Sequence, residues 1–258
     1  MSDDILHSQL LDIIRNKEMS NDIKLAKIDM LIRLGVDVNA KSVKEEHALL
    51  VATAVGNLPI VEFLVEKGAN VNATSSVGFD VSSILIACQN GYNDIVEFLI
   101  EKGAHVNVLY SMTKSPLAMA IDYGHKNVVE TLIKNGARVN EPVVFPVVYV
   151  SNLVRAIKKD NKDIVEILIK NGAKVNQQDA IGYTPLMYAA SKTGNVEIVK
   201  LLIENGADVN IKNSVGKTAL NVAKDKKTQK AIIDAVKERK VKSVIFKVKK
   251  CFWGKGKI

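Results

Sequence analysis

The sequence predicts an all-α fold: a solenoid of about seven stacked helix pairs joined by short hairpin loops. One motif recurs six times, with Leu, Ile or Val, two further residues, Gly, two residues, Val and Asn, at residues 31–39, 64–72, 99–107, 132–140, 168–176 and 202–210. Its glycines are separated by 33, 35, 33, 36 and 34 residues. A fixed period near 33 residues is typical of stacked units that are each too small to bury their own apolar side chains.

The composition suits such an array and indicates where the protein works. Apolar residues make up 47% of the chain, which is enough for a continuous core and argues against disorder. The two cysteines, Cys88 and Cys251, suggest neither a disulfide framework nor a metal set. The N-terminus lacks the pattern of a secretory signal, and no apolar run approaches the length of a membrane span. We therefore expect a cytoplasmic monomer with no cofactor and no bound metal.

The positive charge is confined to the C-terminus. Residues 237–258 contain nine basic residues and one acidic residue, whereas the rest of the chain contains 27 of each. The formal net charge of +8 therefore belongs to this end of the chain, and it says nothing about partners of the array.

The clearest unit spans residues 184–210. Thr184 is predicted to cap a first helix by accepting a backbone N–H, and Pro185 suits the first helical turn. Gly206 is predicted to end the second helix in a left-handed conformation. The apolar stripe of this second helix is broad because the helix must contact both its own partner and a neighbouring unit; it consists of Ile198, Val199, Leu202 and Ile203.

The elements of this unit are Thr-Pro-Leu, Ala-Ala, Gly-Asn, Ile-Val-x-Leu-Leu and Gly-Ala-Asp-Val-Asn. Together they resemble the ankyrin repeat, and the resemblance covers residues 5–240. It implies a curved stack of antiparallel helix pairs, with hairpin loops, called fingers, projecting from one edge. In that family the first helix of each pair lines the concave side and the second helix lies outside.

The predicted units lie near residues 3–39, 40–72, 73–107, 108–140, 141–176, 177–210 and 211–240, and a basic amphipathic tail follows at 241–258. The first unit lacks Thr-Pro-Leu and has longer helices, and the last unit lacks the Gly-Ala-x-Val-Asn ending. Both departures suit terminal units, because one side of each must face water.

Partner-binding residues are expected on fingers and first helices, since aromatic and large apolar side chains dominate the energetics of interfaces. The candidates are Phe79, Tyr110, Met112, Phe145, Val148, Tyr149, Tyr183 and Tyr188. Met119 and Arg155 are weaker candidates on first helices. The segment 141–150 is almost wholly apolar and contains two prolines. Two interpretations stay open for it: an exposed binding finger, or an insert that fills a packing gap.

The tail also allows two interpretations. Its apolar residues repeat at helical spacing, so it can form a further helix that covers the last unit. Alternatively, it binds an anionic membrane surface or a nucleic acid through Lys242, Lys247, Lys249, Lys250 and Trp253.

No set of residues that suggests an enzyme is found in the sequence. The four histidines fall in different units, Cys88 occupies a small buried position in its helix, and no phosphate-binding loop or metal motif occurs. We therefore expect a non-enzymatic scaffold that binds another protein through its fingers and concave face. The alternative is a peripheral membrane or nucleic-acid adaptor that is localised by its tail.

Overall fold

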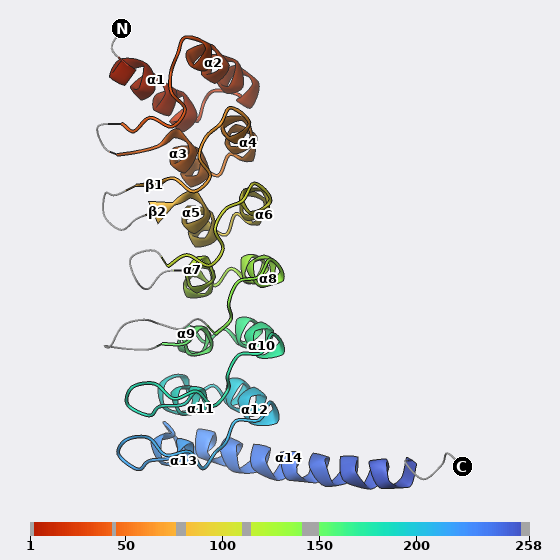
Figure 1. The fold of residues 1–258 in the computed structure, drawn as a ribbon. Helices are drawn as coiled ribbons and strands as arrows, with labels where there is room; N and C mark the ends of the chain where they lie inside the picture. The colour runs from red at the N-terminus through yellow and green to blue at the C-terminus, as the bar shows by residue number, and fades with distance from the viewer. Residues whose placement is uncertain (1–2, 43–44, 76–80, 110–114, 141–149, 254–258) are drawn as a thin grey trace. The chain divides into compact units, whose positions relative to one another are not determined.

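The computed structural model describes residues 3–42, 45–75, 81–109, 115–140 and 150–253, with side chains from Ile5 onward and, near the end of the chain, not beyond Val241. The chain divides into two compact units, Met1–Arg138 and Val139–Ile258. Each unit is a stack of helix pairs, so the solenoid class predicted from the sequence is confirmed (Figure 1).

The first unit contains four helix pairs and one short hairpin. First helices contact first helices and second helices contact second helices along the stack. The elements are α1 (Asp3–Arg15) with α2 (Asn21–Arg33), α3 (Ala48–Val55) with α4 (Leu58–Glu66), the strands β1 (Thr74–Ser75) and β2 (Val81–Ser82), α5 (Ser83–Asn90) with α6 (Asn93–Glu101), and α7 (Pro116–Tyr123) with α8 (Lys126–Lys134).

The second unit repeats this arrangement and ends in a long helix. Its elements are α9 (Asn152–Lys158) with α10 (Lys162–Lys170), α11 (Pro185–Tyr188) continued by the π-helical turn η1 (Ala189–Thr193) and paired with α12 (Val196–Glu204), and α13 (Ala219–Val222) followed by α14 (Lys226–Trp253). The start of α14 packs on α12, where Ala231, Ile232 and Ala235 are buried.

The core of each unit is an apolar stripe along its second helices. Three residues per helix are at most 1% exposed, as the spacing of the repeats predicts: Ile60, Val61 and Leu64; Ile95, Val96 and Leu99; Val128, Val129 and Leu132; Ile164, Val165 and Leu168; Ile198, Val199 and Leu202. Fully burying one such side chain contributes about 1.5–3 kcal/mol. The stripe is therefore the main source of stability in both units.

Local signals at the helix ends also behave as predicted. Ser115 and Thr184 each accept the backbone N–H of the third residue after them, from Ala118 at 3.1 Å and from Met187 at 3.2 Å. The glycines of the six motifs all have φ between +83° and +98°, a range that L side chains rarely adopt. Both helices of the first pair have 13 residues, whereas α3–α8 have eight or nine.

An asparagine ladder ties the turn of each motif to the next turn within a unit. The Asn107 Nδ2 donates to the carbonyl oxygen of Gly136 at 2.9 Å, and its Oδ1 accepts the N–H of Arg138 at 2.9 Å. Four other asparagines make the same pair of bonds to the glycine of the following motif and to the residue two places after it: Asn39, Asn72, Asn140 and Asn176. The last asparagine, Asn210, instead donates to Asp208 of its own turn at 3.1 Å.

Two fingers of the second unit explain the Asp or Asn that stands three residues before their glycine. The Asp179 Oδ1 accepts the N–H groups of Ile181 and Tyr183 at 3.0 and 2.8 Å. In the next finger, the Asn213 Oδ1 accepts the N–H groups of Val215 and Lys217 in the same way. Each side chain thus satisfies two backbone donors that a tight hairpin leaves without a partner. The fingers also touch, because Ser214 donates its N–H to the Ile181 oxygen at 3.1 Å.

Gly182→Ala and Gly216→Ala form a matched pair that isolates this contact between fingers. Their φ angles are +76° and +74°, but an added Cβ would lie 2.9 Å from the Asn213 Cα at Gly182 and would meet nothing within 4 Å at Gly216. We expect Gly216→Ala to lower the free energy of unfolding by about 1–2 kcal/mol through backbone strain alone. Gly182→Ala should cost about 1–3 kcal/mol more because of the added clash. Urea unfolding measures both values, and equal losses would contradict a close contact between the fingers.

Candidate functional site

The first helix α3 exposes apolar side chains because its sequence offers no alternative. Its eight residues include no charged residue and a single hydroxyl, Thr53, which donates to the Leu49 carbonyl at 2.8 Å. Leu49 faces the core and is 2% exposed, whereas Val55 is 41% exposed. A helix that is apolar all round must leave part of its apolar surface uncovered at the edge of a stack.

A groove of about 410 Å³ lies beside this exposed surface in the first unit. Its lining comes from α1, α3, α5 and the β-hairpin, and consists of Arg15, Glu46, Leu50, Val51, Ala54, Val55, Ser75, Val81 and Ile86. The Arg15 Nη2 and Glu46 Oε1 atoms are 2.6 Å apart, so an ion pair borders the apolar lining. Apolar walls with a few fixed polar groups are typical of binding sites.

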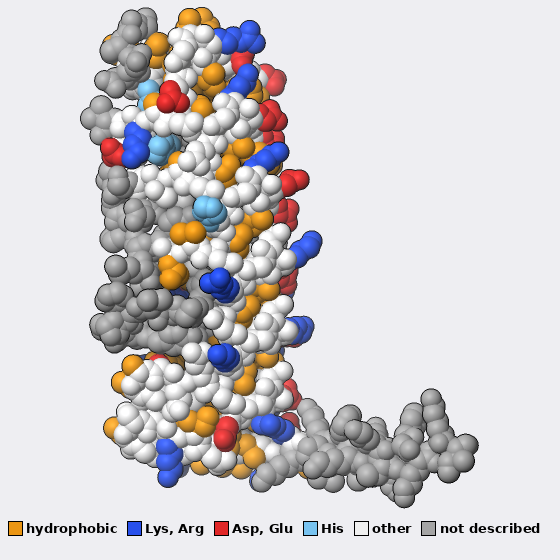
Figure 2. All heavy atoms as spheres, viewed as in Figure 1, with side chains coloured by type: hydrophobic (Ala, Val, Ile, Leu, Met, Phe, Trp, Pro, Cys, Tyr) orange, Lys and Arg blue, Asp and Glu red, His pale blue; other side chains and the backbone are white. Residues whose placement is uncertain are grey.

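The second helices of the same unit carry a different surface. Figure 2 shows Asp and Glu side chains, interspersed with Lys and Arg, along the edge formed by the second helices α2, α4, α6 and α8. The first helices α3 and α5 contain no charged residue. The apolar groove therefore lies on the side of the helix pairs that has the lower charge, which is the side where burial of an apolar partner costs least.

In the second unit, two of the predicted residues come together with Asp179 and Lys158. The rings of Tyr183 and Tyr188 have centroids 5.4 Å apart at an interplanar angle of 57°. The Tyr188 hydroxyl donates to the Asp179 Oδ2 at 2.6 Å, and the Lys158 Nζ lies 4.7 Å from the centroid of the Tyr188 ring. Tyr188 is 8% exposed, so its ring supports Lys158 and contributes little contact surface of its own.

Burial raises the pKa of the Tyr188 hydroxyl well above its ordinary value, and the hydrogen bond to Asp179 adds to the effect. The protonated hydroxyl is a donor, whereas a phenolate would place a negative charge beside the Asp179 carboxylate. The contact between the finger and the first helix therefore depends on this proton.

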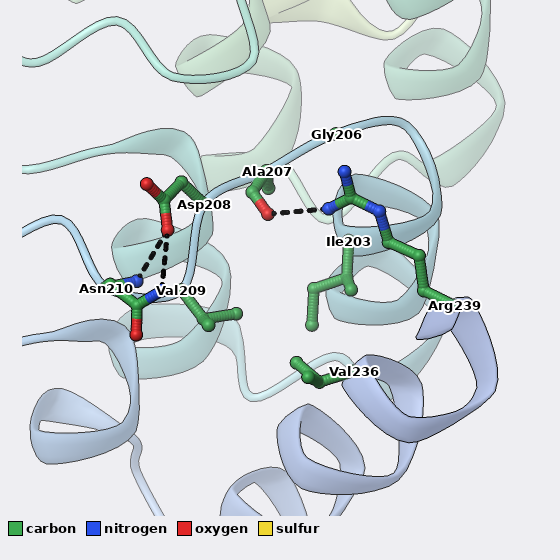
Figure 3. A pocket seen from close by; sticks show the side chains of 8 residues that line it. All are labelled: Ile203, Gly206, Ala207, Asp208, Val209, Asn210, Val236 and Arg239. Carbon is green, nitrogen blue, oxygen red and sulfur yellow. Dashed lines mark hydrogen bonds between the residues drawn. The ribbon is translucent and has the colours of Figure 1, made fainter. Parts of the chain in front are cut away.

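A second groove lies between α14 and the turn of the last motif, residues 206–210. Its volume is about 510 Å³, and Figure 3 shows its lining: Ile203, Gly206, Ala207, Asp208, Val209, Asn210, Val236 and Arg239. The Arg239 Nη1 donates to the Ala207 carbonyl at 3.3 Å. Arg239 thus occupies a carbonyl near the end of the asparagine ladder, and we treat this groove as the terminus of the array rather than as a partner site.

The structure describes only part of the predicted site. Tyr183 and Tyr188 lie side by side, and Met119 and Arg155 occupy the position of Tyr188 in α7 and α9. The other candidates lie outside the described residues or side chains: Phe79, Tyr110, Met112, Phe145, Val148 and Tyr149 on fingers, and Lys242, Lys247, Lys249, Lys250 and Trp253 in the tail. Both interpretations of segment 141–150 stay open for the same reason.

Sequence reasoning missed Val55 and Ile86 of the groove, and it missed the partners Asp179 and Lys158 of Tyr188. A signal for Val55 was present, because a helix without any charged residue cannot bury every side. The partners of Tyr188 had no such signal, since they come from a finger and from a neighbouring first helix.

Cys88 is fully buried, as predicted, and burial raises the pKa of its thiol. The His125 Nε2 lies 2.9 Å from the carbonyl oxygen of Gln89, which is consistent with a structural role. Within the described part of the chain, no three His, Cys, Asp or Glu side chains are grouped so that they can hold a metal ion. None of the described helices is both long and apolar enough to span a membrane.

Tyr188→Phe should change how stability depends on pH. An unfolded tyrosine loses its proton near pH 10, whereas folded Tyr188 retains it to higher pH, so the native state holds more protons and loses stability as the pH rises above 10. We expect this loss to be smaller in Tyr188→Phe, by up to about 1.4 kcal/mol for the first pH unit above 10. Urea unfolding at pH 8 and pH 11 measures it; parallel losses in the two proteins would contradict the assignment.

Comparison with known proteins places this geometry in a family. The family model for ankyrin repeats in three copies matches residues 75–142 and 153–242, and the single ankyrin-repeat model matches residues 45–76. No curated protein gives a significant match. The ankyrin repeat domain of human ASB11 is 28% identical with a TM-score of 0.71, covering 89% of this chain and 96% of that one.

Two further solved structures agree. The ankyrin repeat domain of Bcl-3, a member of the IkappaB protein family, has a TM-score of 0.73 at 21% identity over 86% of this chain and 96% of its own. A chain from the complex of the predatory endopeptidase Bd0816 of Bdellovibrio bacteriovorus with the immunity protein Bd3460 is 31% identical, with a TM-score of 0.64, over 74% of this chain and 99% of its own. The protein belongs to the ankyrin-repeat family.

Proposed function

We propose that this protein is a non-enzymatic scaffold of the cytoplasm that binds a protein partner through its first-helix face and fingers. Ankyrin repeats are generally protein–protein interaction modules. The observation that carries the proposal is the groove of the first unit, whose lining includes Val55, 41% exposed, and the Arg15–Glu46 ion pair. Soluble proteins seldom leave contiguous apolar surface uncovered without a binding role.

The mechanism we propose is preorganisation. The asparagine ladder and the apolar stripe hold each helix pair in place before any partner arrives. A partner that docks on such a surface loses little free energy to the ordering of the scaffold. The related complex of Bd0816 with the immunity protein Bd3460 supports the idea that this architecture occurs in protein complexes.

Val55→Lys tests the groove, and Met30→Lys is its matched control. Val55 and Met30 are both apolar residues in the last turn of a helix, and they are 41% and 62% exposed. Only Val55 lines the groove. A lysine in the groove places an unpaired charge in the interface, and we expect the partner to bind more than about tenfold more weakly. Met30→Lys should bind as the wild type does.

The measurement is quantitative affinity capture from native lysate, followed by titration of the captured partner. Circular dichroism establishes that both variants are folded. If Val55→Lys captures every protein that wild type and Met30→Lys capture, with equal affinity, the groove is not the binding surface.

A second candidate function is a peripheral adaptor that attaches to an anionic surface through the tail. One observation favours it: Arg239 is bonded to the array, yet α14 continues as a helix to Trp253, and Val241 is 58% exposed. The residues beyond Arg239 include seven lysines and no acidic residue. A basic helix that leaves its domain suits a negatively charged membrane.

Deletion of residues 241–258 tests this candidate with vesicles that contain phosphatidylserine and with neutral vesicles. We expect the full chain to bind the anionic vesicles in a salt-dependent manner, because each lysine near such a surface contributes about 1 kcal/mol. The shortened chain should lose this binding and keep its protein partner. Equal binding of both chains at every salt concentration would contradict the adaptor function.

A further inference from the structure

The ends of the first helices change in charge along the chain. In the first unit, the last two residues of α3, α5 and α7 are Ala54–Val55, Gln89–Asn90 and Asp122–Tyr123. In the second unit, lysines stand at these places or just after them. Lys158 ends α9, Lys192 lies in η1, and Lys224 follows α13. Three successive helix pairs thus supply one lysine each.

Lys158 lies beside Tyr188 and Lys224 lies beside Gly194, the two residues between which Lys192 stands in the chain. The Lys158 Nζ lies over the ring of Tyr188 at 4.7 Å. Lys192 follows Tyr188 by one turn and precedes Gly194. A Cβ added at Gly194 would lie 3.3 Å from the Lys224 Cδ, so the Lys224 stem passes over this turn. We call Lys158, Lys192 and Lys224 the lysine row.

The nearby carboxylates that the structure describes accept hydrogen bonds from neutral groups and make no close ion pair with the lysine row. Asp179 accepts the Tyr188 hydroxyl, and Asp160 accepts the Asn195 amide at 2.8 Å. Asp225, next to Lys224, accepts the N–H of Thr228 at 2.7 Å; hydrogen bonds from Thr228 and the positive charges of Lys224 and Lys227 lower the pKa of its carboxyl. Among the described residues, no ion pair within 4.0 Å involves the lysine row.

Two lysines on the second helices of the same unit form ion pairs. The Lys162 Nζ pairs with the Glu197 Oε2 at 2.7 Å, and the Lys170 Nζ pairs with the Glu166 Oε1 at 3.2 Å. These two lysines on the second-helix side are therefore held in close ion pairs, whereas the described part of the lysine row has no carboxylate within 4.0 Å and its nearest charge partner is Asp225, beside Lys224.

We propose that the lysine row binds an extended acidic peptide segment that carries Asp or Glu at about every third residue. Packed helices lie about 8–10 Å apart, and an extended chain advances about 3.3 Å per residue, so three residues span the distance between successive first helices. Tyr188 holds Lys158 in place from below through a cation–π contact. This inference rests on the proposed scaffold function and names the chemistry of the partner at the second unit.

A protein segment fits the lysine row better than a nucleic acid does. Single-stranded nucleic acids are bound through basic grooves combined with exposed aromatic rings on which bases stack. Tyr188 is 8% exposed and lies beneath Lys158, and the neighbouring Tyr183 ring is half-buried and packs against it at a centroid distance of 5.4 Å, so neither ring is a free stacking surface. Carboxylate side chains need no such platform.

The test is fluorescence anisotropy on the full chain with two labelled 12-residue probes. In the spaced peptide, Glu occupies positions 2, 5, 8 and 11 of a Gly/Ser background, and in the clustered peptide the same four Glu residues are contiguous. The variant is Lys158→Gln with Lys192→Gln. The control is Lys170→Gln with Lys200→Gln, which removes two exposed second-helix lysines and gives the same net charge. All proteins keep the basic tail, so its contribution is the same throughout.

We expect the spaced peptide to bind wild type more tightly than the clustered peptide does. The Lys158/Lys192 variant should lose at least about tenfold in affinity for the spaced peptide, and the control less than about twofold. Equal losses in the two variants, or equal affinity for the two peptides, would overturn the proposal. If the Lys158/Lys192 variant also loses as much affinity for a 12-nucleotide oligothymidylate as it loses for the spaced peptide, the lysine row binds a nucleic acid and the proposal is overturned. Partner capture that depends on Val55 would survive each of these failures, so the scaffold function is judged separately.

Discussion

In five of the six motifs, one asparagine side chain links its turn to the turn that follows. Its Nδ2 and Oδ1 atoms bond to the carbonyl of a glycine and to the N–H two residues later, at 2.7–3.0 Å in all five cases. A side-chain amide carries its donor and its acceptor on separate atoms, so it can make both bonds at once. The bond pair therefore fixes both the identity of the asparagine and the backbone conformation of the next turn.

This constraint leaves other positions of the unit free. The asparagine, the motif glycine and the second-helix stripe are fixed by bonds and by burial, whereas the side chains at the ends of the first helices belong neither to the ladder nor to the stripe. Those free positions carry the differences between the two units. Val55 makes an apolar surface in the first unit, and Lys158 and Lys192 make a basic one in the second. Recognition is thus expected where the repeat leaves the sequence unconstrained.

Much of the fold was predictable because repeated residues act locally. The stripe of Ile198, Val199 and Leu202, the cap at Thr184 and the role of Asp179 in its hairpin all follow from spacing or from the chemistry of one side chain. The site was less predictable. The contact between Lys158 and Tyr188 joins two helices 30 residues apart, and no short-range pattern encodes it. The π-helical turn at Ala189–Thr193 places one more residue before Gly194 than other helix pairs have before their turn. The extra residue is visible in the spacing, but spacing does not predict that a π-helical turn accommodates it.

The most direct measurement of the ladder compares the unfolding free energies of Asn107→Ala and Asn210→Ala. Asn107 bonds to the following turn, whereas the described bonds of the Asn210 side chain stay within its own. Each net hydrogen bond is worth about 0.5–1.5 kcal/mol, so Asn107→Ala should lose about 1–3 kcal/mol and Asn210→Ala at most about 1.5 kcal/mol. A loss in Asn210→Ala that equals or exceeds the loss in Asn107→Ala would contradict the claim that these amides hold the turns together.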